Sequence, residues 1–254
     1  MSTAIPPIPA PAPAPAGLSE PQRIVNTFVA PSKTFEDIRR NASWWMPWLL
    51  LSIFGLAVGI VMSKKINWEQ MVRQQVENGP RAAQFESLPK DQQEQQIAIG
   101  VKIGRVLVYA APVFLLIFGL IVAVVLWVTF SFGFAAEIPF SRSMAIVIYS
   151  WLPGIVHGVL ALITLLLKSD TEGLNPNNLV ATNLAYFMDK ASNSKILYGM
   201  AGALDVITIW SIILMGIGFS VNAATRKLSR GAAISTILVL YFLYKLALSG
   251  LGWV

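Results

Sequence analysis

The sequence predicts an all-α integral membrane protein with five transmembrane helices and short interfacial helices. Of its 254 residues, 55% are hydrophobic and 13% are charged, whereas about a quarter of the residues in a soluble domain are charged. The apolar blocks are continuous and of helical length, while the strands of a membrane barrel would alternate every second residue. Tryptophans and basic residues flank the first block, as they do at the ends of membrane spans. These observations favour helical spans over a soluble domain or a barrel.

Composition divides the chain into three parts. Residues 1–18 alternate proline with alanine or isoleucine and are predicted to be a disordered tail, because such a stretch cannot build a core. Residues 19–43 are predicted to form an amphipathic segment on the lipid interface, since Phe35 and Ile38 share a helical face while the charges lie elsewhere. Residues 44–254 form the membrane domain. Its predicted spans are about 44–63, 106–134, 143–167, 198–222 and 231–253.

Small residues and a proline mark predicted packing positions in the first and third spans. Gly55 and Gly59 are four residues apart, and so are Gly154 and Gly158. Such GxxxG steps let two helices approach closely, within one chain or between two copies. Pro153 lies inside the third span, where a proline removes a backbone hydrogen bond and kinks the helix.

The predicted second span is unusually long. The uncharged stretch from Val106 to Ala136 is about 46 Å long as one helix, well beyond the hydrocarbon thickness. It must therefore tilt, bend at Pro112 or end near Gly133. Residues 66–105 before it form the largest predicted extramembrane loop, with an amphipathic helix followed by a polar one. This loop is a candidate surface for a protein partner. The simpler interpretation is that its polar helix only presents a face to water.

The last two spans carry one acid and one base. The residues from Gly231 to Tyr244 are uncharged but too few to cross a bilayer, so the fifth span must include Lys245. Because the two spans are antiparallel, Asp205 and Lys245 are predicted at a similar depth. A lone charge at the membrane centre costs roughly 2.5 to 3.5 kcal/mol, which favours an ion pair that fixes the final hairpin. Two alternatives stay open: an ion or proton site, and a Lys245 side chain that extends to the interface.

The sequence offers little for catalysis. There is no cysteine and one histidine, His157. Ser150 precedes it by seven residues on the same helical face, but two turns separate the pair by about 10 Å, too far for a Ser/His nucleophile. We therefore expect no enzyme, no catalytic residues, no metal and no cofactor. The net charge of +6 is explained by basic residues beside the spans, so we expect no nucleic-acid partner.

Several short motifs occur in a fixed order along the chain. They are FVAPSKTFEDIRR before the first span, YSWLP (Tyr149 to Pro153) in the third, Asn175-Pro176 before the fourth, and then a Leu-Asp opening, Trp210, Gly216, Gly218, a basic turn, Ala232 and Ala233. This ordered set spans roughly residues 20 to 254. It resembles the Yip domain family, polytopic membrane proteins named for their Ypt/Rab-interacting eukaryotic members, and it is most similar to the bacterial branch.

The resemblance implies a non-catalytic protein that organises membranes or binds partners. It also implies an N-terminus on the inner side, which charge counting alone does not decide, and a bacterial inner membrane as the setting. We expect the lipid bilayer as a partner, a protein partner at the N-terminal tail or the 66–105 loop, and self-association through the GxxxG steps. A DLYGP-type motif, found in Rab-binding members, does not precede the first span, so GTPase binding is not expected. The alternative function is a small transporter or channel built around Asp205 and Lys245.

Overall fold

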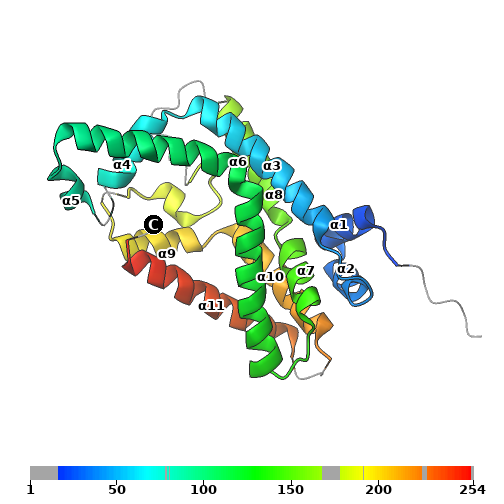
Figure 1. Ribbon diagram of the computed structural model, residues 1–254. Coiled ribbons are helices and arrows are strands. Elements are labelled where there is room, and N and C mark those ends of the chain that lie inside the picture. The colour runs from blue at the N-terminus through cyan, green and yellow to red at the C-terminus, as the bar shows by residue number, and fades with distance from the viewer. Residues whose placement is uncertain are drawn as a thin grey trace, which may run out of the picture.

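The computed structural model describes residues 17–77, 79, 81–167, 178–190, 192–224 and 228–252, and every regular element in these ranges is a helix (Figure 1). The α-helices are α1 (Glu20–Val29), α2 (Pro31–Ile38), α3 (Trp45–Lys65), α4 (Trp68–Glu77), α5 (Ala82–Glu86), α6 (Lys90–Val128), α7 (Phe140–Ser150), α8 (Pro153–Leu167), α9 (Lys195–Ala203), α10 (Val206–Asn222) and α11 (Arg230–Gly250). A π-helix, η1 (Thr129–Gly133), and a 3-10 helix, η2 (Leu184–Phe187), complete the set. Residues 1–16 of the predicted tail, Asn175-Pro176, and the predicted end of the fifth span at 253 lie outside the described residues.

Four helical stretches in the described ranges are long and apolar enough to cross a bilayer. They are Trp45–Lys65, Lys90–Gly133, Phe140–Leu167 and Arg230–Gly250. The predicted all-α membrane fold is therefore confirmed. The predicted fourth span differs, because Leu204 and Asp205 interrupt the helix and separate α9 from α10. α10 alone has 17 residues, about 26 Å, at the short end of what spans a bilayer. Arg230–Gly250 matches the predicted fifth span, whereas the total of five spans stays a prediction.

The second predicted span is the later half of one long, bent helix. α6 and η1 run together for 44 residues, and Figure 1 shows the first half of α6 lying at a steep angle to its second half. Pro112 lies inside α6, and proline is a common cause of such bends. Its carbonyl accepts a hydrogen bond from Nε1 of Trp48 at 3.2 Å, which ties α6 to α3. The helix that contains the long apolar stretch therefore bends within α6, and it ends at Gly133.

The helix of the third predicted span is interrupted just before its proline. α7 ends at Ser150 and α8 begins at Pro153, with Trp151 and Leu152 in the turn between them. Pro153 therefore occupies the first position of a helix, where its missing N–H has no intrahelical acceptor to lose. The N–H of Gly154 donates to the carbonyl of Trp151 at 2.8 Å, so the turn keeps its backbone hydrogen bonds.

α10 is the central helix, and it contacts α2, α7, α8 and α11. Phe219 on α10 is fully buried against Phe130 of η1, with ring centroids 4.7 Å apart. Gly218 lies against Phe35, whose Cδ1 atom would be 3.0 Å from a Cβ at that glycine. A glycine here therefore creates the space into which α2 packs.

The apolar face of α2 is covered by protein and does not face lipid as predicted. Phe35 and Ile38 share a face, as expected, but both are fully buried, because α2 packs against α10 and α7. The amide Nδ2 of Asn222 on α10 donates to the carbonyl of Phe35 at 2.9 Å. Protein, not lipid, covers this apolar face.

Three connections meet at one end of the bundle. The N–H of Ala224, just after α10, donates to the carbonyl of Ala136, just before α7, at 2.9 Å. Arg142 at the start of α7 donates to the carbonyl of Arg39, just after α2, at 3.0 Å. The N-terminal segment, the α6–α7 turn and the end of α10 therefore lie together, as they would if each long helix crossed the membrane in alternating directions.

Candidate functional site

Asp205 lies at the break between α9 and α10. It is the N-cap of α10, where one carboxylate oxygen accepts a hydrogen bond from the N–H of Thr208 at 2.7 Å. The other oxygen accepts from the hydroxyl of Thr182, and the N–H of Val206 donates to the Thr182 carbonyl at 2.9 Å. A carboxylate suits this position because it satisfies free N–H groups and faces the positive end of the helix dipole. Asp205 therefore sets the start of α10.

Lys245 lies on α11 and is partly exposed. Among the described residues, no ion pair within 4 Å joins it to Asp205, so the structure does not bring the predicted pair together. Tyr241, one turn earlier on α11, reaches the α9–α10 break instead, and its hydroxyl donates to the carbonyl of Ala203 at 3.2 Å. Lys245 is five residues from the end of α11 at Gly250, about 8 Å, which a long lysine side chain can span to reach the interface.

The four glycines of the GxxxG steps have different surroundings. A Cβ on Gly59 would lie 2.8 Å from Cγ1 of Val108 on α6, so this glycine permits the close approach of α3 and α6. Gly154 and Gly158 face side chains of α3 at ordinary contact distances, 3.8 Å and 3.5 Å. A Cβ on Gly55 would meet no described atom within 4 Å. Of these four glycines, only Gly55 faces outward from the described helices.

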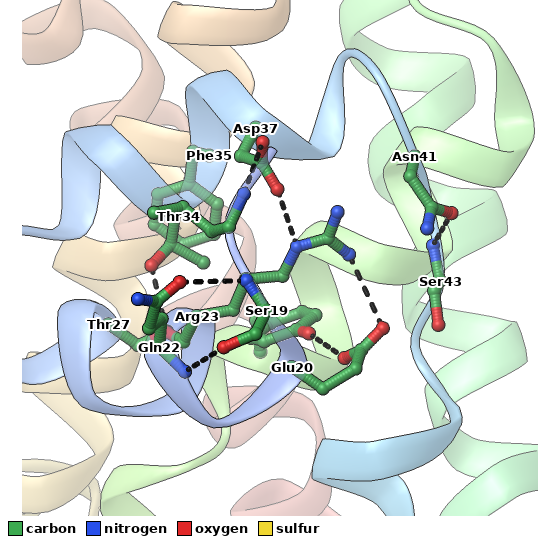
Figure 2. A network of polar contacts seen from close by, with 12 residues as sticks. Ser19, Glu20, Gln22, Arg23, Thr27, Thr34, Phe35, Asp37, Asn41 and Ser43 are labelled. Atoms are coloured by element: carbon green, nitrogen blue, oxygen red, sulfur yellow. Dashed lines mark hydrogen bonds and ion pairs between the residues drawn. The ribbon is translucent and has the colours of Figure 1, made fainter. Parts of the chain in front are cut away.

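A buried polar network holds the N-terminal segment on the membrane helices (Figure 2). Nε of Arg23 on α1 donates to Oδ2 of Asp37 on α2 at 2.6 Å, and these side chains are only 3% and 6% exposed. The hydroxyl of Tyr149 on α7 donates to Oε2 of Glu20 on α1 at 2.8 Å. The hydroxyl of Thr34 donates to the carbonyl of Arg23 at 2.8 Å. The network therefore joins the consecutive helices α1 and α2 to α7, which lies more than a hundred residues later.

Arg23 is the centre of this network, and Figure 2 shows it between Asp37 and Glu20. Burial alone would lower its pKa, but the hydrogen bonds with Asp37 and Tyr149 and the negative charge of Asp37 outweigh burial, and the pKa is raised above its ordinary value. Its Nη1 atom lies 3.5 Å from Oε1 of Glu20, an ion pair without a hydrogen bond. Because the raised pKa belongs to a base, its stabilisation is complete below the ordinary pKa of arginine and is lost only at more strongly alkaline pH.

The sequence gives only a partial signal for this network. Arg23 and Asp37 are fourteen residues apart, and Glu20 and Tyr149 are 129 apart, so no local pattern connects them. The available signal is the Ser19–Gln22 capping box, which begins α1. It predicts the start of the helix but not that α7 and α10 will bury one of its sides.

A second distinctive feature is the surface arm, by which we mean α4, α5 and the part of α6 up to Arg105. It has its own small core of Val72, Phe85 and Ile97. A Cβ on Gly100 would lie 2.6 Å from Cγ1 of Val72, so this glycine lets α6 pack closely on α4. The arm is thus a folded unit rather than an open loop.

The part of α6 in and beside this arm has three different faces. One face packs on α4 through Ile97, Gly100 and Gly104. At 100° per residue, the other residues divide into a polar face and an apolar face about 100° apart. The exposed polar face carries Ala98, Lys102 and Arg105. The apolar face carries Ile99, Ile103 and Val106, which are 51%, 53% and 60% exposed.

Within the described residues, no group of three or more His, Cys, Asp or Glu side chains is placed to hold a metal ion, and a helix break separates Ser150 from His157.

A family model described as the Yip1 domain matches residues 25–249. The comparisons with curated proteins and with solved structures return no match. The matched range contains the α10 core, the Asp205 break and the surface arm. The chain belongs to the Yip1 domain family.

Proposed function

We propose that this protein is a non-catalytic, membrane-organising protein of the Yip type, which acts through contacts with the bilayer and with partner proteins. One observation carries the proposal: the surface arm presents an exposed apolar face beside an exposed charged face. The buried polar groups, by contrast, serve packing and helix capping. The 66–105 loop that contains the arm is also our candidate surface for a protein partner, and Gly55 is our candidate contact between copies.

The bend in α6 suggests how the arm acts. If the later half of α6 crosses the bilayer, its first half runs along the membrane surface (Figure 1). Ile99 and Ile103 then lie among acyl chains, while Lys102 and Arg105 face headgroups and water. A helix embedded in one leaflet adds area to that leaflet alone. The arm would therefore favour curved membrane.

The proposal predicts that the purified protein, reconstituted at a fixed protein-to-lipid ratio, makes liposomes smaller or tubular. The double variant Ile99→Glu/Ile103→Glu should lose this effect, because each isoleucine contributes roughly 1.5 to 3 kcal/mol of apolar burial that a carboxylate cannot supply. Liposome diameters measured by electron cryomicroscopy give the readout.

A matched control adds the same two charges to the surface arm away from its apolar face. The variant Gln84→Glu/Ala98→Glu changes two exposed positions, on α5 and on the polar face of α6, and should reshape liposomes as the unmodified protein does. The proposal fails if the unmodified protein leaves liposome diameters unchanged, or if both variants lose the effect equally.

We also propose that the protein lies in a bacterial inner membrane with its N-terminus inside. The basic residues from Arg226 to Arg230, of which Arg226 and Lys227 lie outside the described residues, support this orientation, since cytoplasmic connections are enriched in Lys and Arg. Because the chain has no cysteine, Lys33→Cys provides a clean test. An impermeant maleimide should label it only after cells are opened, and labelling of intact cells would reverse the orientation.

A second candidate function, a small transporter or channel, is favoured by one observation. The helix break at Asp205 resembles the discontinuous helices that form ion and substrate sites in transporters. Both carboxylate oxygens already accept hydrogen bonds from Thr182 and Thr208, which is why we place this function second. Proton or sodium flux in the same liposomes, abolished by Asp205→Asn, would replace the first proposal with this one.

A further inference from the structure

Basic side chains from three separate segments gather around α2. Arg230 at the start of α11 places its Nη2 atom 3.4 Å from Oγ of Ser32 at the start of α2. Arg142 at the start of α7 donates to the carbonyl of Arg39, just beyond the end of α2, at 3.0 Å. Lys33 projects from α2 itself and is exposed. We call Lys33, Arg39, Arg142 and Arg230 the basic row.

The basic row has little opposing charge. In the part of the chain that the structure describes, none of its four cations lies within 4 Å of a carboxylate. The exposed acids on the neighbouring elements are Glu36 on α2 and Glu137 in the α6–α7 turn. The row is therefore a net positive surface.

Exposed apolar residues place this surface at a lipid boundary. Val25 and Val29, four residues apart on α1, are 59% and 73% exposed, and Phe132 of η1 is 73% exposed. α1 packs on α2, and η1 leads into the turn that the basic row adjoins. Apolar side chains beside arginines and lysines are typical of a surface that lies among lipid headgroups.

We propose that the basic row binds the phosphate groups of anionic phospholipids and that this binding stabilises the docked N-terminal segment. The inner side of α2 carries Phe35 and Ile38, which are buried in the core. A ligand held on the outer side of this two-turn helix favours the state in which its inner side is packed, because binding to the folded form alone stabilises that form. The inference goes beyond the proposed function, which concerns the surface arm.

The test measures thermal unfolding of delipidated protein in detergent with added phosphatidylglycerol, phosphatidylcholine or inorganic phosphate. At a lipid concentration of about 100 times the apparent Kd, phosphatidylglycerol should raise the melting temperature by about 5 °C or more. Phosphatidylcholine and inorganic phosphate should raise it much less. The number of phosphatidylglycerol molecules retained in native mass spectrometry gives a second readout that does not depend on unfolding.

Two variants with the same charge change separate this surface from general electrostatics. The triple variant Lys33→Gln/Arg39→Gln/Arg230→Gln should lose both the temperature shift and the retained lipid. The triple variant Arg73→Gln/Arg81→Gln/Lys90→Gln, on the surface arm, should keep both. If the first variant does not fold, Lys33→Gln alone should still retain fewer lipids. Equal responses of the two triple variants, or equal shifts with the two lipids or with phosphate, would overturn the inference.

Discussion

Replacing Arg23 by methionine is expected to lower the free energy of unfolding by about 3 to 5 kcal/mol, the usual cost of removing one partner from a buried ion pair. The change leaves the Asp37 carboxylate, only 6% exposed, without its cation. Loss of this contact should also loosen α1 and α2 from α7 and α10. Unfolding in mixed detergent micelles, followed by tryptophan fluorescence, measures the change.

Two further variants test whether the buried charge is the cause. The double variant Arg23→Met/Asp37→Leu should recover part of the loss, because apolar pairs often replace buried ion pairs at little cost. Arg73→Met removes an ion pair with Glu69 whose side chains are 40% and 70% exposed, and it should change stability by less than about 1 kcal/mol. A double variant less stable than Arg23→Met would contradict this explanation.

A methyl group at Gly216 is expected to destabilise the protein by about 1 to 3 kcal/mol through overpacking. A Cβ at this position would overlap Cγ1 of Ile234 on α11 and would lie 2.9 Å from both the N and Cα atoms of that residue. Side chains can rotate away, but the backbone of α11 can yield only if the two helices separate. Unfolding of Gly216→Ala in mixed micelles gives the measurement.

Gly55→Ala is the matched control, because it places the same methyl group in another span where no described atom lies within 4 Å of it. Alanine has a higher helix propensity than glycine by about 1 kcal/mol, so this variant should be neutral or slightly more stable. Equal losses from Gly216→Ala and Gly55→Ala would show that close contact between α10 and α11 does not determine the effect.

The sequence predicts the long apolar helices well, because span length and hydrophobicity are local properties. The shared face of Phe35 and Ile38 was likewise correct, since helical periodicity fixes it. The prediction that this face contacts lipid is wrong, because α7 and α10, which lie more than a hundred residues away in the sequence, cover it. Pattern alone cannot separate a face that meets lipid from one that meets protein, as both are apolar.

The interpretation of Asp205 shows a similar limit. If residues 198–222 formed one continuous helix, the depth of Asp205 in the membrane would predict an ion pair with Lys245 on α11. The chain instead breaks at Leu204 and Asp205, so the carboxylate caps α10 and bonds to Thr182 in the preceding connection. An aspartate immediately before an apolar run is itself an N-cap signal, which its charge alone does not indicate. The surface arm was predicted only as a loop with helices, because its orientation depends on the bend in α6.

The most direct measurement of the central claim is the depth of the surface arm in a bilayer. Since the chain has no cysteine, a single spin label can be attached at Ile99→Cys, Ile103→Cys or Ala98→Cys in the reconstituted protein. We predict that labels at 99 and 103 collide mainly with oxygen dissolved in lipid, while the label at 98 collides mainly with a water-soluble nickel complex. If all three labels are equally accessible to nickel, the arm does not lie in the bilayer, and the membrane-organising account is wrong.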